Sequence, residues 1–249
     1  IMFQNRKGER EHAWTTSWGV STRLIGGLIM THSDDDGLII PPRLAPSHVV
    51  ILPIVRKPED KEKIFPYCDE IAEKLRRQEY QGSKLRVEVD KRDINAGEKG
   101  WQWVKKGIPL RIEVGPRDYE KQAVFVGRRD SRDKFALAKD EVVNRVPTLL
   151  DEIQQVLFDR ALAFREQHSQ QIDDAMEFKQ FFTPKNKKKP EFHGGFAHSC
   201  WCGDSKCENA INKDLSVSIR CLPTKAGTRG NCIHCGKSDS QRVVFAKAY

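Results

Sequence analysis

Apolar and polar positions in the middle of the chain switch repeatedly between strand and helix patterns. Residues 48–55 form a continuous apolar run, which is typical of a buried parallel strand. A helix is predicted from Pro58, with apolar positions at helical spacing up to Leu75, although Pro66 predicts a kink or a late start. Further strands are predicted at 85–89, 110–114 and 123–128, and a short helix at 97–106. This alternation predicts an α/β unit with a mostly parallel sheet.

Two segments flank this unit. Residues 11–44 are predicted as strand, turn and strand, because a glycine-containing run at 19–30 is followed by turn-forming residues at 33–37 and two prolines. Residues 146–167 carry the clearest helical stripe of the chain, which predicts a linking helix. After it the composition changes to a cysteine-rich tail. We therefore expect three domains, at 1–45, 46–145 and 146–249.

Composition narrows the class of protein. The 249 residues carry 43 Lys and Arg against 35 Asp and Glu, a net charge of +8, and 38% are hydrophobic. These values are typical of a soluble globular protein, and no apolar run approaches the ~20 residues of a membrane span. Six of the seven cysteines lie in the last fifth of the chain, which indicates a reducing compartment, and we expect a cytoplasmic protein. Because Ile1 is not an initiator methionine, we also expect a piece of a longer chain.

The cysteine-rich tail predicts a metal site. Cys202 and Cys207 form a C-x4-C pair, and Cys232 and Cys235 form a C-x2-C pair. Two such thiolate pairs can meet at one Zn²⁺ in a tetrahedral, closed shell that stabilises the fold and leaves no position for a catalytic water. Four other residues compete as ligands: Cys200, Cys221, His198 and His234. The alternative is that these are simply reduced, buried cysteines.

Basic and aromatic residues indicate contact with nucleic acid. Residues 98–107 combine two tryptophans with lysines, and four arginines follow on or beside predicted strands: Arg111, Arg117, Arg128 and Arg129. Indoles stack on unpaired bases while cations hold phosphates, so the composition suits single-stranded RNA. The alternative is core packing for Trp103 and a paired surface for the arginines. Arg23, near glycines, can offer a planar fork to a phosphate or lie on the surface.

Three separated motifs resemble one family. Residues 16–26, Thr-Ser-Trp-Gly-Val-Ser-Thr-Arg-Leu-Ile-Gly, resemble the third signature motif of class II prolyl-tRNA synthetases, and residues 37–46 continue the match. Residues 107–118 resemble the signature of the anticodon-binding domain of that class. The tail, ending at Tyr249, resembles the extra zinc domain of the archaeal and eukaryotic-like branch, which some bacteria also carry. The resemblance covers essentially the whole chain.

The resemblance implies a fold and a reaction. The fold is α/β: the end of an antiparallel catalytic sheet, an anticodon-binding domain with a mixed, mostly parallel sheet, and a small α+β zinc-binding domain. The implied reaction joins proline to tRNA(Pro) through prolyl-adenylate, with ATP and Mg²⁺. Arg23 is the implied catalytic and ATP-binding arginine, with Ser21 beside it at the nucleotide. Ser17, Trp18 and Gly19 are the implied proline pocket.

The resemblance also implies a tRNA contact surface, and it implies that two motifs of the family are not present in this sequence. Lys106, Arg111, Arg117 and Asp118 match positions near the anticodon, where carboxylate and guanidinium groups suit guanine. The chain departs from many relatives at Val104, where an acidic anticodon contact is frequent. Motifs one and two are expected upstream of Ile1, so the segment alone is expected to be inactive. The whole enzyme is expected to be a homodimer, with no membrane or DNA partner.

Two functions remain open from the sequence. One is the C-terminal portion of a prolyl-tRNA synthetase, and the other is a non-catalytic, synthetase-like module that binds RNA. Retention of the motif-three residues favours the enzyme. On that reading we expect Arg23 to line the floor of a cavity near Trp18, with its other walls supplied by polypeptide outside this sequence.

Overall fold

The computed structural model describes residues 1–184, 186, 195–225 and 227–247. The chain divides into two compact units, Ile1–Leu157 and Phe158–Tyr249. We describe each unit by itself. Tyr249, which the resemblance singled out, lies outside the described residues. Among the described residues, no helix has both the length and the apolar character needed to cross a membrane.

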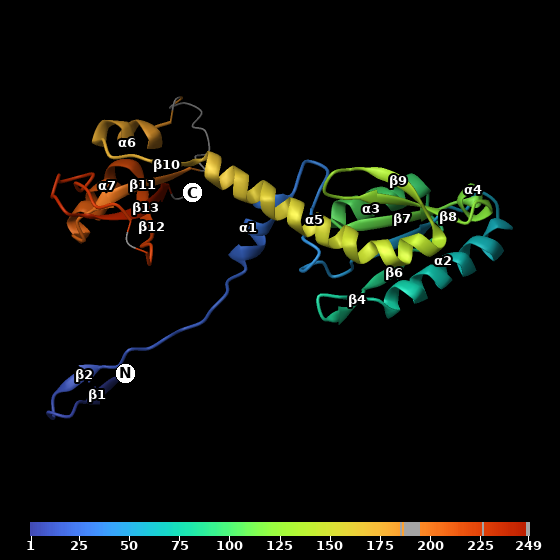
Figure 1. The fold of residues 1–249 in the computed structure, drawn as a ribbon, viewed down its shortest axis with the longest axis horizontal. Coiled ribbons are helices and arrows are strands. Elements are labelled where there is room, and N and C mark those ends of the chain that lie inside the picture. The colour runs from blue at the N-terminus through green and yellow to red at the C-terminus, as the bar shows by residue number, and fades with distance from the viewer. Residues whose placement is uncertain (185, 187–194, 226, 248–249) are drawn as a thin grey trace. The chain divides into compact units, whose positions relative to one another are not determined.

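A five-stranded sheet forms the centre of the first unit (Figure 1). Its strand order is β6 (Val87–Val89), β3 (Val49–Pro53), β7 (Leu110–Val114), β8 (Ala123–Arg128) and β9 (Lys134–Ala138). β3 pairs in parallel with β6 and β7, whereas β7 with β8 and β8 with β9 pair antiparallel. The mixed α/β class is confirmed, but the prediction of a mostly parallel sheet is wrong. β9 was missed because a short charged loop at 129–133 turns the chain directly back on itself.

Helices cover the two faces of this sheet unequally. Residues of α2 (Asp60–Arg77) and α5 (Lys139–Gln167) join alternate sheet positions in the main apolar cluster, with Tyr119 of α4 (Pro116–Glu120) packed against it. α3 (Ala96–Lys106) lies on the other face, where Trp103 packs against Val50 and Leu52. The opposite face of β7, β8 and β9 therefore lies beside α3 and carries polar residues.

Helix boundaries follow the sequence with one correction. α2 includes Pro66, and α3 begins at a cap where the Asn95 side chain accepts from the Gly97 N–H at 2.9 Å. The linking helix was predicted to begin at residue 146, but α5 begins at Lys139, because Val142, Val143 and Val146 extend its buried stripe by two turns. A short hairpin of β4 (Glu79–Tyr80) and β5 (Ser83–Lys84) follows α2.

The N-terminal segment corrects a second prediction. Residues 2–12 form a hairpin of β1 (Met2–Gln4) and β2 (Arg10–His12), residues 14–21 carry no helix or strand, and α1 spans Arg23–His32. The predicted strand over 19–30 is therefore wrong from Arg23 onward. No strand lies beside this segment within the described chain, and a helix satisfies its own backbone groups without a partner. No residue of α1 is buried.

A buried ion pair attaches the segment after α1 to the sheet. The Arg129 side chain, 3% exposed, donates to both carboxylate oxygens of Asp34 at 2.9 and 2.5 Å. The Leu38 N–H donates to the Lys105 carbonyl at 3.1 Å, at the end of α3. Gly107 follows with φ of 71°, and a Cβ there would lie 2.7 Å from Leu38. We call residues 33–40 together with Arg129 the clip.

The second unit is built on a four-stranded sheet, and α6 (Ala175–Phe182) and α7 (Ser205–Leu215) belong to the same unit. The order is β10 (Ser169–Gln171), β11 (Phe196–Trp201), β13 (Gln241–Lys247) and β12 (Val217–Cys221). α6 is capped by the Asp174 side chain, and α7 by that of Asp204. Phe178 packs edge-on against Phe182 and Phe245 at centroid distances of 5.0 and 5.2 Å, and these rings fill the core.

Candidate metal centre and nucleic-acid interface

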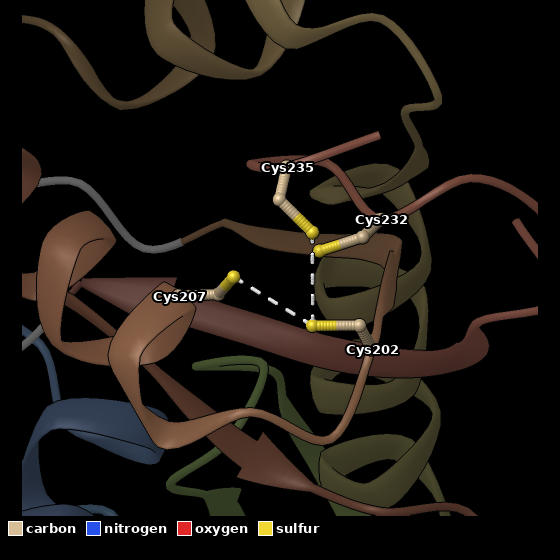
Figure 2. Close-up of side chains that lie close together, drawn as sticks. All are labelled: Cys202, Cys207, Cys232 and Cys235. Carbon is tan, nitrogen blue, oxygen red and sulfur yellow. Dashed lines mark hydrogen bonds between the residues drawn. The ribbon is translucent and has the colours of Figure 1, made fainter. Parts of the chain in front are cut away.

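Four cysteine sulfurs converge in the second unit (Figure 2). The Sγ atoms of Cys202, Cys207, Cys232 and Cys235 all lie within 4.8 Å of one another. Cys202 lies 3.6 Å from Cys207 and 3.8 Å from Cys235, measured between sulfurs. Four thiolates around a tetrahedral Zn²⁺ at a Zn–S distance of about 2.3 Å stand about 3.8 Å apart. The donor set and its spacing therefore fit zinc.

Strand pairing brings the two cysteine loops together. Cys202 directly follows β11, and Cys207 lies in the first turn of α7. Cys232 and Cys235 lie in a turn that precedes β13, where the Gly236 N–H donates to the Cys232 carbonyl at 2.9 Å. Because β11 and β13 pair antiparallel, with Trp201 opposite Gln241, both loops emerge at the same end of the sheet. The fold thus creates the site from two sequence-distant pairs.

The thiols of this cluster have unequal proton affinities. Burial raises the pKa of Cys232, but backbone hydrogen bonds from Cys235, His234 and Cys202 outweigh it and lower that pKa to about 7. Burial raises the pKa of the Cys207 thiol well above its ordinary value. A metal ligand must be a thiolate, so metal binding and proton release are linked at this cluster.

The four competing ligands lie outside the cluster. Cys200 is buried within β11, where its Sγ lies 4.0 Å from the Thr228 carbonyl. Cys221 is exposed at the end of β12. Neither of these cysteines, nor His198 or His234, belongs to the group of converging donors that the described residues contain. The geometry therefore selects the two short-spaced pairs.

A cavity of about 370 Å³ lies in the first unit between α3 and the polar face of the sheet. α3 contributes Gly97, Gly100, Trp101 and Val104, and Ile54 follows β3. The Trp101 side chain is 44% exposed at this site, so its ring is partly open to solvent. The cavity thus combines an apolar wall and an aromatic ring with the charged residues of β7 and β9.

Arg111 is the most enclosed charge of this cavity. It is 8% exposed, and its Nε atom is buried with no hydrogen-bond partner among the described residues. Burial lowers the pKa of this guanidinium from its very high ordinary value. Its terminal nitrogen lies 3.3 Å from the position that a Cβ on Gly127 would occupy, so only a glycine on β8 leaves the fork this much room. A buried donor without a hydrogen-bond partner is costly, so we expect a water molecule or a ligand in the cavity to accept from it.

Two further charged residues face the same cavity. Glu113 lies two positions after Arg111 on β7 and therefore shares its face of the sheet. Its carboxylate lies 4.0 Å from Arg111 Nε and 3.8 Å from the Nζ of Lys134 on β9. Sequence reasoning missed both. Strand alternation from Arg111 gave a signal for Glu113, whereas Lys134 lay on the strand that was not predicted.

The other anticodon candidates do not line this cavity. Lys106 is exposed, with its Nζ 4.1 Å from the centre of the Trp103 ring. Arg117 is exposed on α4. Asp118 accepts from the Gly115 N–H at 2.8 Å and so helps to begin that helix. Of the four predicted contacts, Arg111 alone lines the cavity, and the roles of the other three remain predictions.

The predicted ATP and proline residues are not gathered into a pocket. Ser17, Gly19, Ser21 and Arg23 are exposed, and Trp18 is 94% exposed. None of them lines either of the two cavities described in this structure. The expectation that Arg23 lines a cavity is therefore not met within the described residues, and its role rests on the resemblance.

Comparisons with known proteins agree on one class. A family profile described as "Anticodon binding domain" matches residues 48–149, and one described as "Prolyl-tRNA synthetase, C-terminal" matches residues 186–249. The first range contains the five-stranded sheet with its cavity, and the second contains all four converging cysteines. These two matches place the chain in the class of aminoacyl-tRNA synthetases.

Full-length comparisons identify the family. The chain is 48% identical over 255 residues to "Proline--tRNA ligase 2" of Anaeromyxobacter dehalogenans and 44% identical over 252 residues to "Proline--tRNA ligase" of Bdellovibrio bacteriovorus, matching 100% of this chain and 50% of each relative. A crystal structure of prolyl-tRNA synthetase from Cryptosporidium parvum, complexed with L-proline and AMP, matches with a TM-score of 0.82 at 32% identity, covering 100% of this chain and 50% of that one. The chain belongs to the prolyl-tRNA synthetase family. It spans about half the length of these relatives.

Proposed function

We propose that this chain is the tRNA-binding, carboxy-terminal part of a proline–tRNA ligase. The observation that carries the proposal is the cavity beside α3, where the buried Arg111 fork has an unpaired donor. Unpaired bases of a tRNA loop are recognised through their edges and by stacking on aromatic rings. Arg111 supplies the donors and Trp101 supplies the ring. The cavity is therefore expected to take a base of the proline anticodon.

Proline activation belongs to the longer enzyme on this proposal. The resemblance implies that Arg23 and Ser21 contact ATP, with Mg²⁺, and that Ser17, Trp18 and Gly19 contact proline. The 94% exposure of Trp18 and the open position of Arg23 suit residues that complete a pocket whose other walls are formed elsewhere in the enzyme. We propose that the enzyme is cytoplasmic and homodimeric, and the seven free cysteines support a reducing compartment.

Binding to a tRNA(Pro) anticodon stem-loop tests the RNA part. We expect this chain to bind that stem-loop more tightly than one with its anticodon guanines replaced by adenines. Arg111→Met removes the fork at similar volume and is expected to weaken binding by about 1–3 kcal/mol. Lys63→Met, which removes an exposed charge from α2, is the matched control and is expected to have a small effect. Equal loss in both variants, or equal binding of both RNAs, contradicts the proposal.

We also propose that the four-cysteine cluster holds a structural zinc ion. Cys202, Cys207, Cys232 and Cys235 would supply four thiolates and fill a tetrahedral shell, so the metal would stabilise the second unit without taking part in the reaction. Elemental analysis is expected to find about one zinc per chain. Cys207→Ser is expected to lose the zinc, whereas Cys221→Ser, outside the cluster, is expected to keep it. A folded second unit without zinc would contradict this assignment.

A further inference from the structure

The carboxylate of Glu113 is held in the cavity without a hydrogen-bonded partner. The Glu113 side chain is 27% exposed. Its two ion pairs, at 4.0 Å to Arg111 and 3.8 Å to Lys134, are both longer than a hydrogen bond. Within the described part of the chain no hydrogen bond to this carboxylate is present. Both of its oxygens therefore keep acceptor capacity toward a molecule in the cavity.

Strand register fixes where this carboxylate can reach. Arg111 pairs across the sheet with Gly127, and Gly127 pairs with Lys134. Glu113 pairs with Phe125, so it lies one pleat further along the same face. The acceptor pair of Glu113 and the donor fork of Arg111 thus stand side by side on rigid strands. Their separation of 4.0 Å leaves them free to engage neighbouring atoms of one planar ligand.

The chemistry of the four bases selects one partner for this arrangement. A carboxylate offers two parallel acceptors, which match two adjacent N–H donors. Among the standard bases only guanine presents such a pair on its Watson–Crick edge, N1–H and the N2 amino group, beside the O6 acceptor. Adenine and cytosine each offer a single amino donor there, next to an acceptor that a carboxylate repels. The guanidinium of Arg111, whose Nε has no hydrogen-bond partner among the described residues, suits the O6 acceptor.

We infer that Glu113 is a specificity-determining residue that reads the N1–H and N2 amino edge of one anticodon guanine, beside Arg111. This inference rests on the proposed function, because it assigns one further contact to the same cavity. The Nζ atom of Lys134, 3.8 Å from the carboxylate, adds a second positive charge beside the Glu113 acceptors. The apolar Val104 wall offers no competing polar group to the base.

Inosine provides the sharpest test, because it differs from guanosine only by lacking the N2 amino group. This chain is titrated with the tRNA(Pro) anticodon stem-loop and with versions in which one guanine at a time is replaced by inosine or adenosine. For the unsubstituted chain, inosine at one position is expected to weaken binding about 10-fold, which is within the range for one bidentate base contact. Glu113→Gln is expected to bring that guanine-to-inosine ratio close to one at the same position.

Control experiments distinguish a failure of this inference from a failure of the proposed function. Glu120→Gln, an exposed change of equal chemistry on α4, is expected to leave the ratio unchanged. Hydrogen exchange of β7 and β8 shows whether Glu113→Gln remains folded, and the inosine arm alters the RNA alone. If the unsubstituted chain prefers guanine to adenine but not to inosine, or if Glu113→Gln keeps the inosine ratio, the inference is overturned and the proposed function stands. If guanine and adenine bind equally, the proposed function itself fails.

Discussion

Replacing Asp34 with alanine removes the charged partner of Arg129, the buried arginine of the clip. Arg129 is 3% exposed and donates to both oxygens of Asp34, while its remaining hydrogen bonds go to the carbonyls of Gly37 and Val104 at 3.1 Å each. The Arg129 hydrogen bond holds the pKa of the Asp34 carboxyl well below its ordinary value, against the opposing effect of burial. The pair is therefore strongly formed in the folded chain.

The expected cost follows from what the alanine leaves behind. Removing one partner of a buried ion pair costs about 3–5 kcal/mol when the other charge stays buried. Asp34 is 27% exposed, and Arg129 keeps two carbonyl acceptors, so we expect a cost at or below the lower limit of this range, about 2–3 kcal/mol. Because the folded pKa of Asp34 is lowered, its contribution is present above the unfolded-state pKa of about 4 and is lost as the pH falls toward the folded value.

Hydrogen exchange in increasing urea measures this cost locally. Peptides from β8 report the free energy of unfolding of the first unit, and peptides from residues 33–40 report opening of the clip. Asp35→Ala, an exposed change in the same turn, is the control and is expected to have little effect. The double variant Asp34→Ala/Arg129→Met is expected to lose less stability than the sum of its parts. The reasoning is refuted if the two single costs simply add in the double variant, or if Asp34→Ala costs no more than Asp35→Ala. It is also refuted if the difference in unfolding free energy between the unsubstituted chain and Asp34→Ala is as large at pH 3 as at neutral pH.

Three other substitutions test neighbouring features. Gly107→Ala places a Cβ 2.7 Å from Leu38 at a φ of 71° and is expected to cost about 1–3 kcal/mol with faster exchange at Leu38, whereas Gly100→Ala, with nothing within 4 Å, is expected to stabilise the chain. Trp103→Phe removes the 2.7 Å hydrogen bond from the indole to Asp90 and is expected to cost about 1–3 kcal/mol in urea unfolding. Burial lowers the pKa of His48 to about 4, so stability is expected to fall as the pH drops from 6.5 toward 4, and His48→Gln is expected to flatten that slope.

The α/β unit could be predicted where local signals and tertiary packing agree. The spacing of apolar residues indicated α2, and the continuous run at 48–55 indicated β3, because both elements bury those residues. The two failures have physical causes. Residues 19–30 contain both glycines and aliphatic residues, so the pattern alone did not separate strand from helix. β9 was missed because its charged turn and the exposed Lys134 resembled a surface loop.

The four converging cysteines show how much of the candidate metal site could be predicted from spacing in the sequence. The two short pairs identified the four residues whose sulfurs converge, because each pair is closed by a local turn. The choice against Cys200 depends on the fold, since that residue lies inside β11 with its sulfur toward Thr228. Only the antiparallel pairing of β11 with β13 brings the two loops to one point. This long-range pairing cannot be predicted from the sequence of either cysteine pair alone.

The position of α3, and with it one wall of the cavity, is fixed from three directions. Trp103 anchors the helix to the sheet through the apolar contact with Leu52 and the hydrogen bond to Asp90. The C-terminal end of α3 is bound to the clip, because the Leu38 N–H donates to the Lys105 carbonyl. Arg129 donates both to the carbonyl of Val104 in the cavity wall and to Asp34. One buried guanidinium therefore joins the segment that follows α1 to the wall of the cavity. A shift of residues 33–40 cannot occur without either unpairing that charge or moving the helix that carries Trp101.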